Sequence, residues 1–148
     1  MEEDVLFMRQ AIREAMNAFD QDEVPVGAVV VANGQIIARA HNLTERLHDV
    51  TAHAEMQAIT AASNALGAKY LPDCTLYVTL EPCTMCAGAL FWSQIGRVVY
   101  GASDVKRGFQ TMGGQLHPKT KVKSGVEADV CGDLMTEFFR TKRKQAKV

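Results

Sequence analysis

The sequence predicts an α/β fold of three layers, α/β/α, in which a mixed, mostly five-stranded sheet carries helices on both faces. Short segments rich in β-branched residues alternate with longer segments whose apolar residues recur at helical spacing. The first two strands are close neighbours in the chain, whereas the later strands are separated by helices, as in βα units. At 148 residues, of which 47% are hydrophobic, the chain suits one domain over 1–148, with a core that needs no disulfides.

The first half of the chain predicts a helix, a β-hairpin and a second helix. Their expected bounds are 5–19, Val26–Val31 with Gln35–Ala40, and 53–66. The first helix follows from apolar residues at helical spacing. Asn33-Gly34 favours the positive φ angles of a tight turn, so the two strands are expected to form a hairpin. The second helix follows a polar loop, is rich in alanine, and is expected to end at Gly67.

The second half predicts strand, helix and strand, then an irregular stretch, a short strand and a final helix. The expected bounds are Thr75–Leu80, Pro82 to about Gln94, Arg97–Gly101, Lys121–Ala128, and about Val130 to Lys144. Pro82 suits the first helical position, where its missing N–H is harmless. In sheets of this kind, sites form at the carboxyl ends of strands and the amino ends of helices.

Charge is distributed unevenly, although the net charge is only −1. Residues 1–100 carry 6 Lys and Arg against 12 Asp and Glu, whereas residues 101–148 carry 10 against 5. This asymmetry favours a local anion-binding face, such as one for nucleic acid, with an ordinary solvated surface as the alternative. The acidic start lacks a secretory pattern, and no apolar run approaches about 18 residues. We therefore expect a cytoplasmic protein without a membrane span.

Two of the four cysteines form a motif that is typical of a metal site. Cys83 and Cys86 stand at i and i+3 of the helix expected after Pro82, so they are neighbours on its surface. The amino end of a helix favours thiolate, the form that binds metal. Cys74 and Cys131 have no such partner nearby and are expected to be small buried residues.

His53 and Glu55 complete a candidate catalytic site. His53 offers a third, neutral ligand beside the two thiolates, which leaves a fourth position for water and so matches catalytic zinc. Zinc brings the pKa of a bound water towards neutrality. Glu55 is the candidate for proton transfer, although residues two apart on an ideal helix point in different directions. His-x-Glu followed by Pro-Cys-x-x-Cys is the signature of zinc nucleobase deaminases, and it predicts a hydrolytic deaminase.

Each part of this pattern has a simpler interpretation when it stands alone. Cys-x-x-Cys also occurs in redox proteins, a single histidine is usually a loop residue, and a single glutamate is usually a helix former. We expect Trp92 in the core. The remaining histidines are expected in loops and outside the metal site: His41, His48 and His117.

Longer stretches around both motifs resemble the bacterial tRNA-specific adenosine deaminases of the cytidine-deaminase-like superfamily. These stretches are Thr51–Glu55, Leu80–Ala89, Gly96–Asp104, Pro25–Val29 and Phe138–Arg140. The resemblance covers nearly the whole chain. The zinc motifs identify only the superfamily, whereas the segment after Arg97 and the basic end favour the tRNA branch.

The resemblance implies hydrolysis of a tRNA wobble adenosine to inosine by a homodimer with one Zn²⁺ per subunit. It also implies contacts to the flipped base from Asn42, Val26 and the backbone of Ala54, to the anticodon loop from Asp104 and Lys106, and to RNA from Arg140. Glu55 would pass a proton from the attacking water to the ring nitrogen beside C6 of adenine, and then to the leaving ammonia.

Three other functions compete with this prediction. A deaminase of a free nucleobase or nucleoside, of the guanine or cytosine type, shares the zinc motifs but needs no basic face. An RNA-binding module with a structural zinc requires four protein ligands, whereas the sequence offers three. A thiol redox protein would form a disulfide on oxidation and bind no metal.

Overall fold

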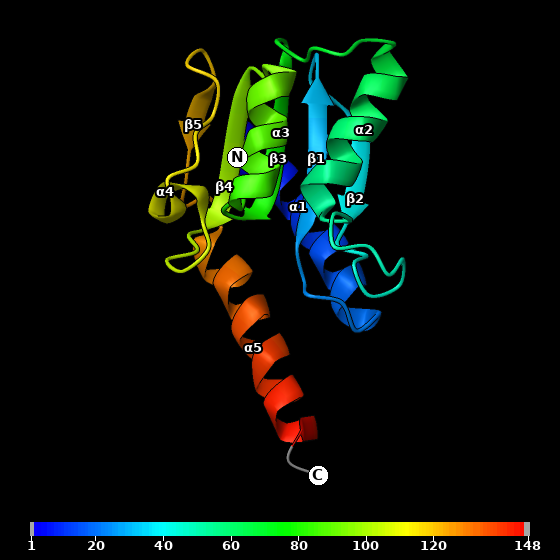
Figure 1. Cartoon of the computed structure of the whole chain (residues 1–148), viewed down its shortest axis with the longest axis vertical. Coiled ribbons are helices and arrows are strands. Elements are labelled where there is room, and N and C mark those ends of the chain that lie inside the picture. Colours follow the sequence, from blue (N-terminus) through cyan, green and yellow to red (C-terminus); the bar gives the residue numbers. More distant parts are fainter. Residues whose placement is uncertain (1, 147–148) are drawn as a thin grey trace.

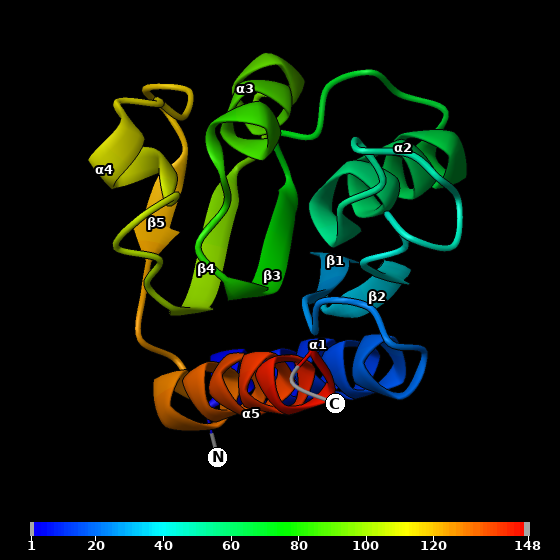
Figure 2. The same ribbon diagram turned by 60° about the horizontal axis from the view of Figure 1, so that its bottom comes forward.

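The computed structural model describes residues 2–146 and contains one five-stranded sheet between two layers of helices (Figures 1 and 2). The strand order is β2-β1-β3-β4-β5. The strands are β1 (Gly27–Ala32), β2 (Gln35–His41), β3 (Cys74–Leu80), β4 (Arg97–Ala102) and β5 (Lys121–Lys123). β1 pairs antiparallel with β2 and β3, whereas β3, β4 and β5 are parallel. The predicted mixed sheet with helices on both faces is confirmed.

Helices cover both faces of the sheet. They are α1 (Glu3–Asp20), α2 (Ala54–Leu66), α3 (Thr84–Ser93), the short α4 (Phe109–Met112) and α5 (Ala128–Ala146). Figure 2 shows α1 and α5 side by side on one face and α2 and α3 on the other. α5 extends past the end of the sheet, as Figure 1 shows. Among residues 2–146, none of these helices combines the length and apolar character needed to cross a membrane.

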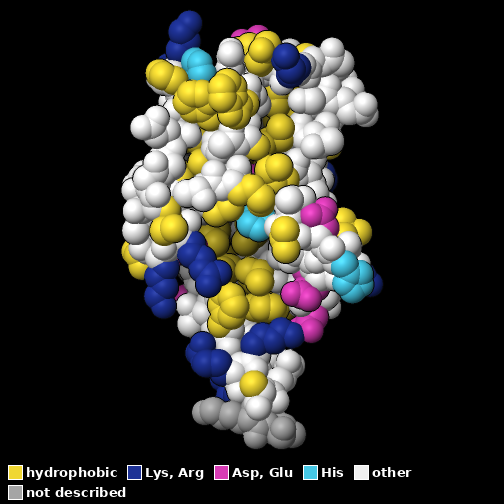
Figure 3. Space-filling model, viewed as in Figure 1, with side chains coloured by type: hydrophobic (Ala, Val, Ile, Leu, Met, Phe, Trp, Pro, Cys, Tyr) yellow, Lys and Arg dark blue, Asp and Glu magenta, His cyan; other side chains and the backbone are white. Residues whose placement is uncertain are grey.

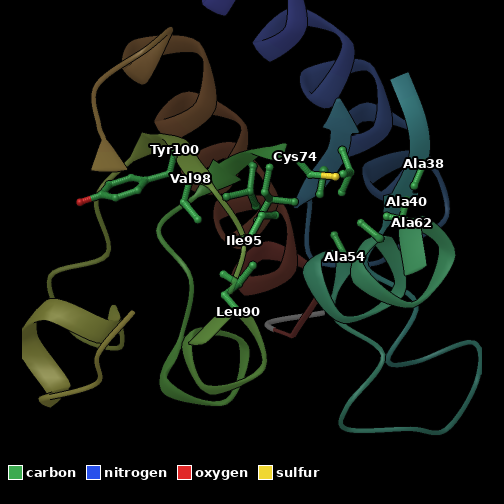
Figure 4. Close-up of a cluster of buried hydrophobic side chains, with 14 of the residues drawn as sticks. Ala38, Ala40, Ala54, Ala62, Cys74, Leu90, Ile95, Val98 and Tyr100 are labelled. Atoms are coloured by element: carbon green, nitrogen blue, oxygen red, sulfur yellow. The ribbon is translucent and has the colours of Figure 1, made fainter. Parts of the chain in front are cut away.

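The side chains of β1 alternate between two hydrophobic clusters, one on each face of the sheet. Ala28 and Val30 belong to the cluster under α2 and α3, and Figure 4 shows other members of it, such as Leu90 and Ile95. Val29 belongs to the second cluster, which packs against α1 and α5. Successive residues of a strand point to opposite faces, so a strand covered on both faces is apolar throughout.

Several element boundaries differ from the sequence prediction for local physical reasons. β5 ends at Lys123 instead of Ala128, because the chain turns at Gly125, whose φ of 84° is left-handed. The stretch 102–120, expected to be irregular, contains the short helix α4. Four residues are too few to show a helical spacing of apolar residues in the sequence. The hairpin turn at Asn33-Gly34 is confirmed by positive φ angles of 51° and 72°.

The topology brings both helix starts and several loops to one edge of the sheet. β3 and β4 end at this edge, β1 begins there, and β2 ends there, as their pairing registers require. α2 and α3 begin there as well. This is the edge at which open α/β sheets form their sites.

Candidate zinc centre and its cavity

Three side chains from two helix starts converge at this edge of the sheet. The Nδ1 atom of His53 lies 3.6 Å from the Sγ atom of Cys83 and 3.4 Å from that of Cys86. The three ligand atoms all lie within 4.8 Å of one another. Tetrahedral zinc with its usual bond lengths holds a nitrogen and a sulfur ligand about 3.5 Å apart. The donor set therefore fits zinc in both chemistry and spacing.

The backbone before each helix explains how the ligands meet. His53 is the N-cap of α2 and Cys83 is the N-cap of α3, and both have extended backbones. The prediction that Pro82 occupies the first helical position is wrong. The Pro82 carbonyl accepts the N–H of Phe109, and Cys83 forms a β-bridge with Gly108, so the chain stays extended until Thr84.

The thiols favour binding of a divalent cation. Hydrogen bonds from Cys86 and His53 lower the pKa of Cys83 to about 4, despite its partial burial. The neighbouring Cys83 and burial raise the pKa of the Cys86 thiol. The Cys83 thiolate thus forms readily, and its negative charge opposes ionisation of the Cys86 thiol. A metal ion relieves that opposition, because it binds both thiolates.

Glu55 lies at the second position of α2 and lines the same cavity as His53 and Cys83. Only 4% of the residue is exposed. Burial raises the pKa of Glu55 to about 7, and the nearby His53 opposes that rise. The sequence analysis placed both His53 and Glu55 inside one helix, where side chains two residues apart point in different directions. Since His53 precedes the helix with an extended backbone, His53 and Glu55 border the same space.

A cavity of about 790 Å³ opens beside these ligands. Its apolar walls and the basic side chains at its edge appear on the face shown in Figure 3. Five of the predicted substrate contacts line it: Val26, Asn42, Ala54, Asp104 and Lys106. Arg140 is not among the described residues that line the cavity. Its guanidinium instead forms an ion pair with Glu137, at 2.6 Å.

One face of α5 supplies lining residues that the sequence analysis missed. They are Gly132, Met135, Thr136, Phe139 and Arg143. Their spacing of three and four residues follows a single helical face, and this spacing was the available signal. Arg143 therefore reaches the cavity from the turn after Arg140. The loop after β4 adds Val105 and Arg107.

Of the remaining predictions about single residues, some are confirmed and others are wrong. Cys74 and Cys131 are buried, as expected. The prediction of a core position for Trp92 is wrong, because 74% of this residue is exposed. His41 is the last residue of β2 and not a loop residue, and its ring contacts Glu14 and Gln21.

The chain matches known deaminases along nearly its whole length. The family model of the cytidine and deoxycytidylate deaminase zinc-binding region matches residues 1–102. The chain is 47% identical to a tRNA-specific adenosine deaminase of Bacillus subtilis, over 99% of this chain and 95% of that one. It is 46% identical to a tRNA-specific adenosine deaminase of Agrobacterium fabrum, over 97% and 98%.

A solved structure agrees with these sequence matches. It comes from studies of A-to-I editing by tRNA:A34 deaminases at the wobble position of transfer RNA. Its TM-score to this chain is 0.82 at 45% identity, and the match covers 87% of this chain and 98% of that one. The ligand geometry, the fold and these relatives lead to one conclusion: the chain belongs to the tRNA-specific adenosine deaminase family, within the zinc-binding cytidine and deoxycytidylate deaminases.

Proposed function

We propose that this chain hydrolyses the wobble adenosine of a tRNA anticodon to inosine and releases ammonia. The observation that carries the proposal is the clustering of His53, Cys83 and Cys86 beside a cavity that His53, Cys83 and Glu55 line, in a chain of this family. The cavity volume of about 790 Å³ lies within the range typical of small-molecule sites. It suits one unstacked nucleoside, which a single-stranded loop presents at low energetic cost.

Zinc held by His53, Cys83 and Cys86 supplies Lewis-acid activation of a water molecule. Glu55 then carries the protons. Its carboxylate accepts a proton from the attacking water, delivers it to the ring nitrogen beside C6, and passes the next one to the departing ammonia. The burial of Glu55 beside the ligands supports this role, because the carboxylate borders the space where the base would react.

Base and RNA contacts are assigned to opposite sides of the cavity. Asn42, Val26 and the backbone of Ala54 would hold the base, since all three line the cavity on the side of α2. Asp104 and Lys106 would meet the anticodon loop on the other side. The Oδ1 atom of Asp104 accepts the N–H of Lys106 at 3.2 Å, which favours a fixed turn at this place.

The basic end of α5 would contact RNA phosphate. Arg143 lines the cavity, and Arg140 is exposed on the preceding turn of the same helix. Such contacts release counterions from the RNA, so binding should weaken with salt.

The proposed enzyme is a cytoplasmic homodimer whose single domain carries one zinc site per subunit. The family resemblance supports dimerisation. Apolar side chains also gather over the carboxyl end of α3 (Figure 3), where Trp92 packs edge-to-face on Phe91 while remaining 74% exposed. Exposed apolar surface of this kind is common at protein interfaces.

The direct test is incubation of the zinc-loaded protein with total tRNA, followed by nucleoside analysis. We expect inosine to appear in tRNA, and not with the matched variant Glu55→Ala. Parallel reactions with free adenosine, guanine and cytosine, read by ammonia release, test the competing function. Ammonia from a free base without inosine in tRNA would refute the proposed substrate and favour a free-base deaminase.

A further inference from the structure

A buried glutamate beneath the loop after β4 binds that loop through its backbone. Glu81 follows β3 directly and is only 5% exposed. Its Oε1 atom accepts the N–H of Asp104 at 3.0 Å, and its Oε2 atom accepts that of Gln110 at 3.1 Å. A Cβ atom at Gly108 would overlap the Glu81 carboxyl group, so the loop lies directly on it. Two residues after Glu81 stands the ligand Cys83.

A second buried glutamate binds the loop before α2 in the same way. Glu23 is fully buried. Its Oε1 atom accepts the N–H of Glu45 at 3.0 Å, and its Oε2 atom accepts that of Arg46 at 2.8 Å. This loop connects Asn42, which lines the cavity, to the ligand His53. Both glutamates thus use both carboxyl oxygens to hold backbone N–H groups.

The two loops border the cavity on different sides. In Figures 1 and 2 the loop over 42–53 lies beside α2, and the loop over 103–108 lies beside the end of β4. The first contributes Asn42, Thr44 and His53 to the cavity wall, and the second contributes Ser103 to Arg107. The width of the opening therefore depends on where these loops are held.

We propose that Glu23 and Glu81 are positioning residues that fix the two rims of the cavity, and so set how the site accepts its RNA substrate. The identity of that substrate rests on the proposed function above, whereas the anchoring of the loops does not. The carboxyl oxygens of both residues are already engaged by backbone donors. This assigns the two glutamates to holding the loops, and Glu55 to moving protons.

The chemistry explains why a carboxylate suits this task. An ionised carboxylate has only acceptors, so both of its oxygens can bind N–H groups. Hydrogen bonds to a charged acceptor are stronger than neutral ones, and a buried N–H without a partner is costly. A glutamine of the same shape keeps one acceptor and turns a donor towards the second N–H. The change Glu→Gln therefore removes the anchoring with little change in volume.

The experiment compares Glu81→Gln and Glu23→Gln by amide hydrogen exchange on the zinc-loaded full chain. In Glu81→Gln we expect the segment 103–112 to exchange at least about ten-fold faster, while the segment 43–48 keeps its protection. In Glu23→Gln we expect the reverse pattern. Each variant thus controls the other. Glu3→Gln, which removes the same charge from an exposed position on α1, is expected to change neither segment.

Kinetics with an anticodon stem-loop then separates positioning from general stability. We expect both variants to keep about one zinc per chain and to raise KM several-fold, with a smaller change in kcat. Glu81→Asp keeps two acceptor oxygens, is expected to regain part of the protection, and replaces the glutamine variant if that one does not fold.

Three results would overturn the proposal: unchanged exchange in the variant's own loop, faster exchange spread evenly over the sheet, or an unchanged KM with a loosened loop. Absence of any tRNA deamination by the unmodified protein would instead refute the proposed function. The exchange data would still decide whether the glutamates anchor the loops.

Discussion

Asp4 connects the first turn of α1 to three parallel strands, and its replacement by asparagine should destabilise the fold measurably. Its carboxylate accepts two bonds of 2.7 Å from Arg97, one of 2.7 Å from the Tyr77 hydroxyl, and one of 3.1 Å from Lys123. Asp4→Asn removes the charge and turns an amide donor towards these donors. The residue is only 6% exposed, so water replaces the lost bonds poorly.

The expected loss follows from these contacts. A hydrogen bond to a charged group contributes about 1.5–3 kcal/mol to the unfolding free energy. The Arg97 and Lys123 side chains are 31% and 40% exposed, so water compensates part of their loss. We expect Asp4→Asn to lower the unfolding free energy by about 2–4 kcal/mol. For a domain of this size, that corresponds to a drop in Tm of roughly 5–15 °C.

The difference in unfolding free energy between the wild type and Asp4→Asn should depend on pH. Arg97, helped by Tyr77 and Lys123, holds the pKa of Asp4 well below its usual value of 3.8. The stabilisation is therefore complete above the unfolded pKa and is lost as pH falls towards the folded one. Asparagine does not titrate in this range, so the gap between wild type and variant should narrow below about pH 4.

The assay is denaturant unfolding of both proteins at about pH 7 and about pH 3. Metal loss in acid affects both proteins alike and does not alter the comparison. An equal stability at neutral pH, or a gap that stays constant or widens in acid, would refute the reasoning.

Four further changes test the site and its support. Glu55→Ala should retain zinc and lose turnover by orders of magnitude, and normal inosine formation would exclude the proton-transfer role. Cys86→Ala should lose the metal and melt at lower temperature, because metal binding contributes to folding, and full zinc content would contradict its role as a ligand. Gly27→Ala places a Cβ atom against the backbone carbonyl of Ala11, so we expect a loss of at least about 1–3 kcal/mol in the unfolding free energy; an unchanged Tm would contradict this packing. Arg143→Gln should lower the slope of log affinity against log salt by about 1, and an unchanged slope would place Arg143 away from RNA phosphate.

The sequence predicted most of the elements and the grouping of His53, Cys83 and Cys86, because both depend on local patterns. Alternation and helical spacing identify strands and helices when one face is buried. The signature around His53 and Cys83 specifies ligands through residue type and spacing alone. The structure then supplied what the pattern lacked, namely that His53 is a helix cap with an extended backbone.

Trp92 shows where such patterns fail. α3 is apolar on nearly every side, so periodicity cannot tell its buried face from its exposed one. Its buried residues are Cys86, Ala87, Leu90 and Ser93, which lie on one helical face. Trp92 lies on another face of the helix and is 74% exposed.

Glu23 and Glu81 show a second limit of the sequence. Each is an acidic residue shortly before a proline, and nothing local marks it as buried. Their partners lie 22 to 29 residues further along the chain. Contacts of this range depend on how the sheet brings loops together, and only the three-dimensional fold reveals them.

The central claim is that one histidine and two cysteines hold a zinc ion whose fourth position stays open to water. X-ray absorption spectroscopy of the purified protein tests it most directly. We expect two sulfur ligands at about 2.3 Å, one imidazole nitrogen at about 2.0 Å, and one further light ligand. Four protein ligands around the zinc, or active protein without zinc, would contradict the claim.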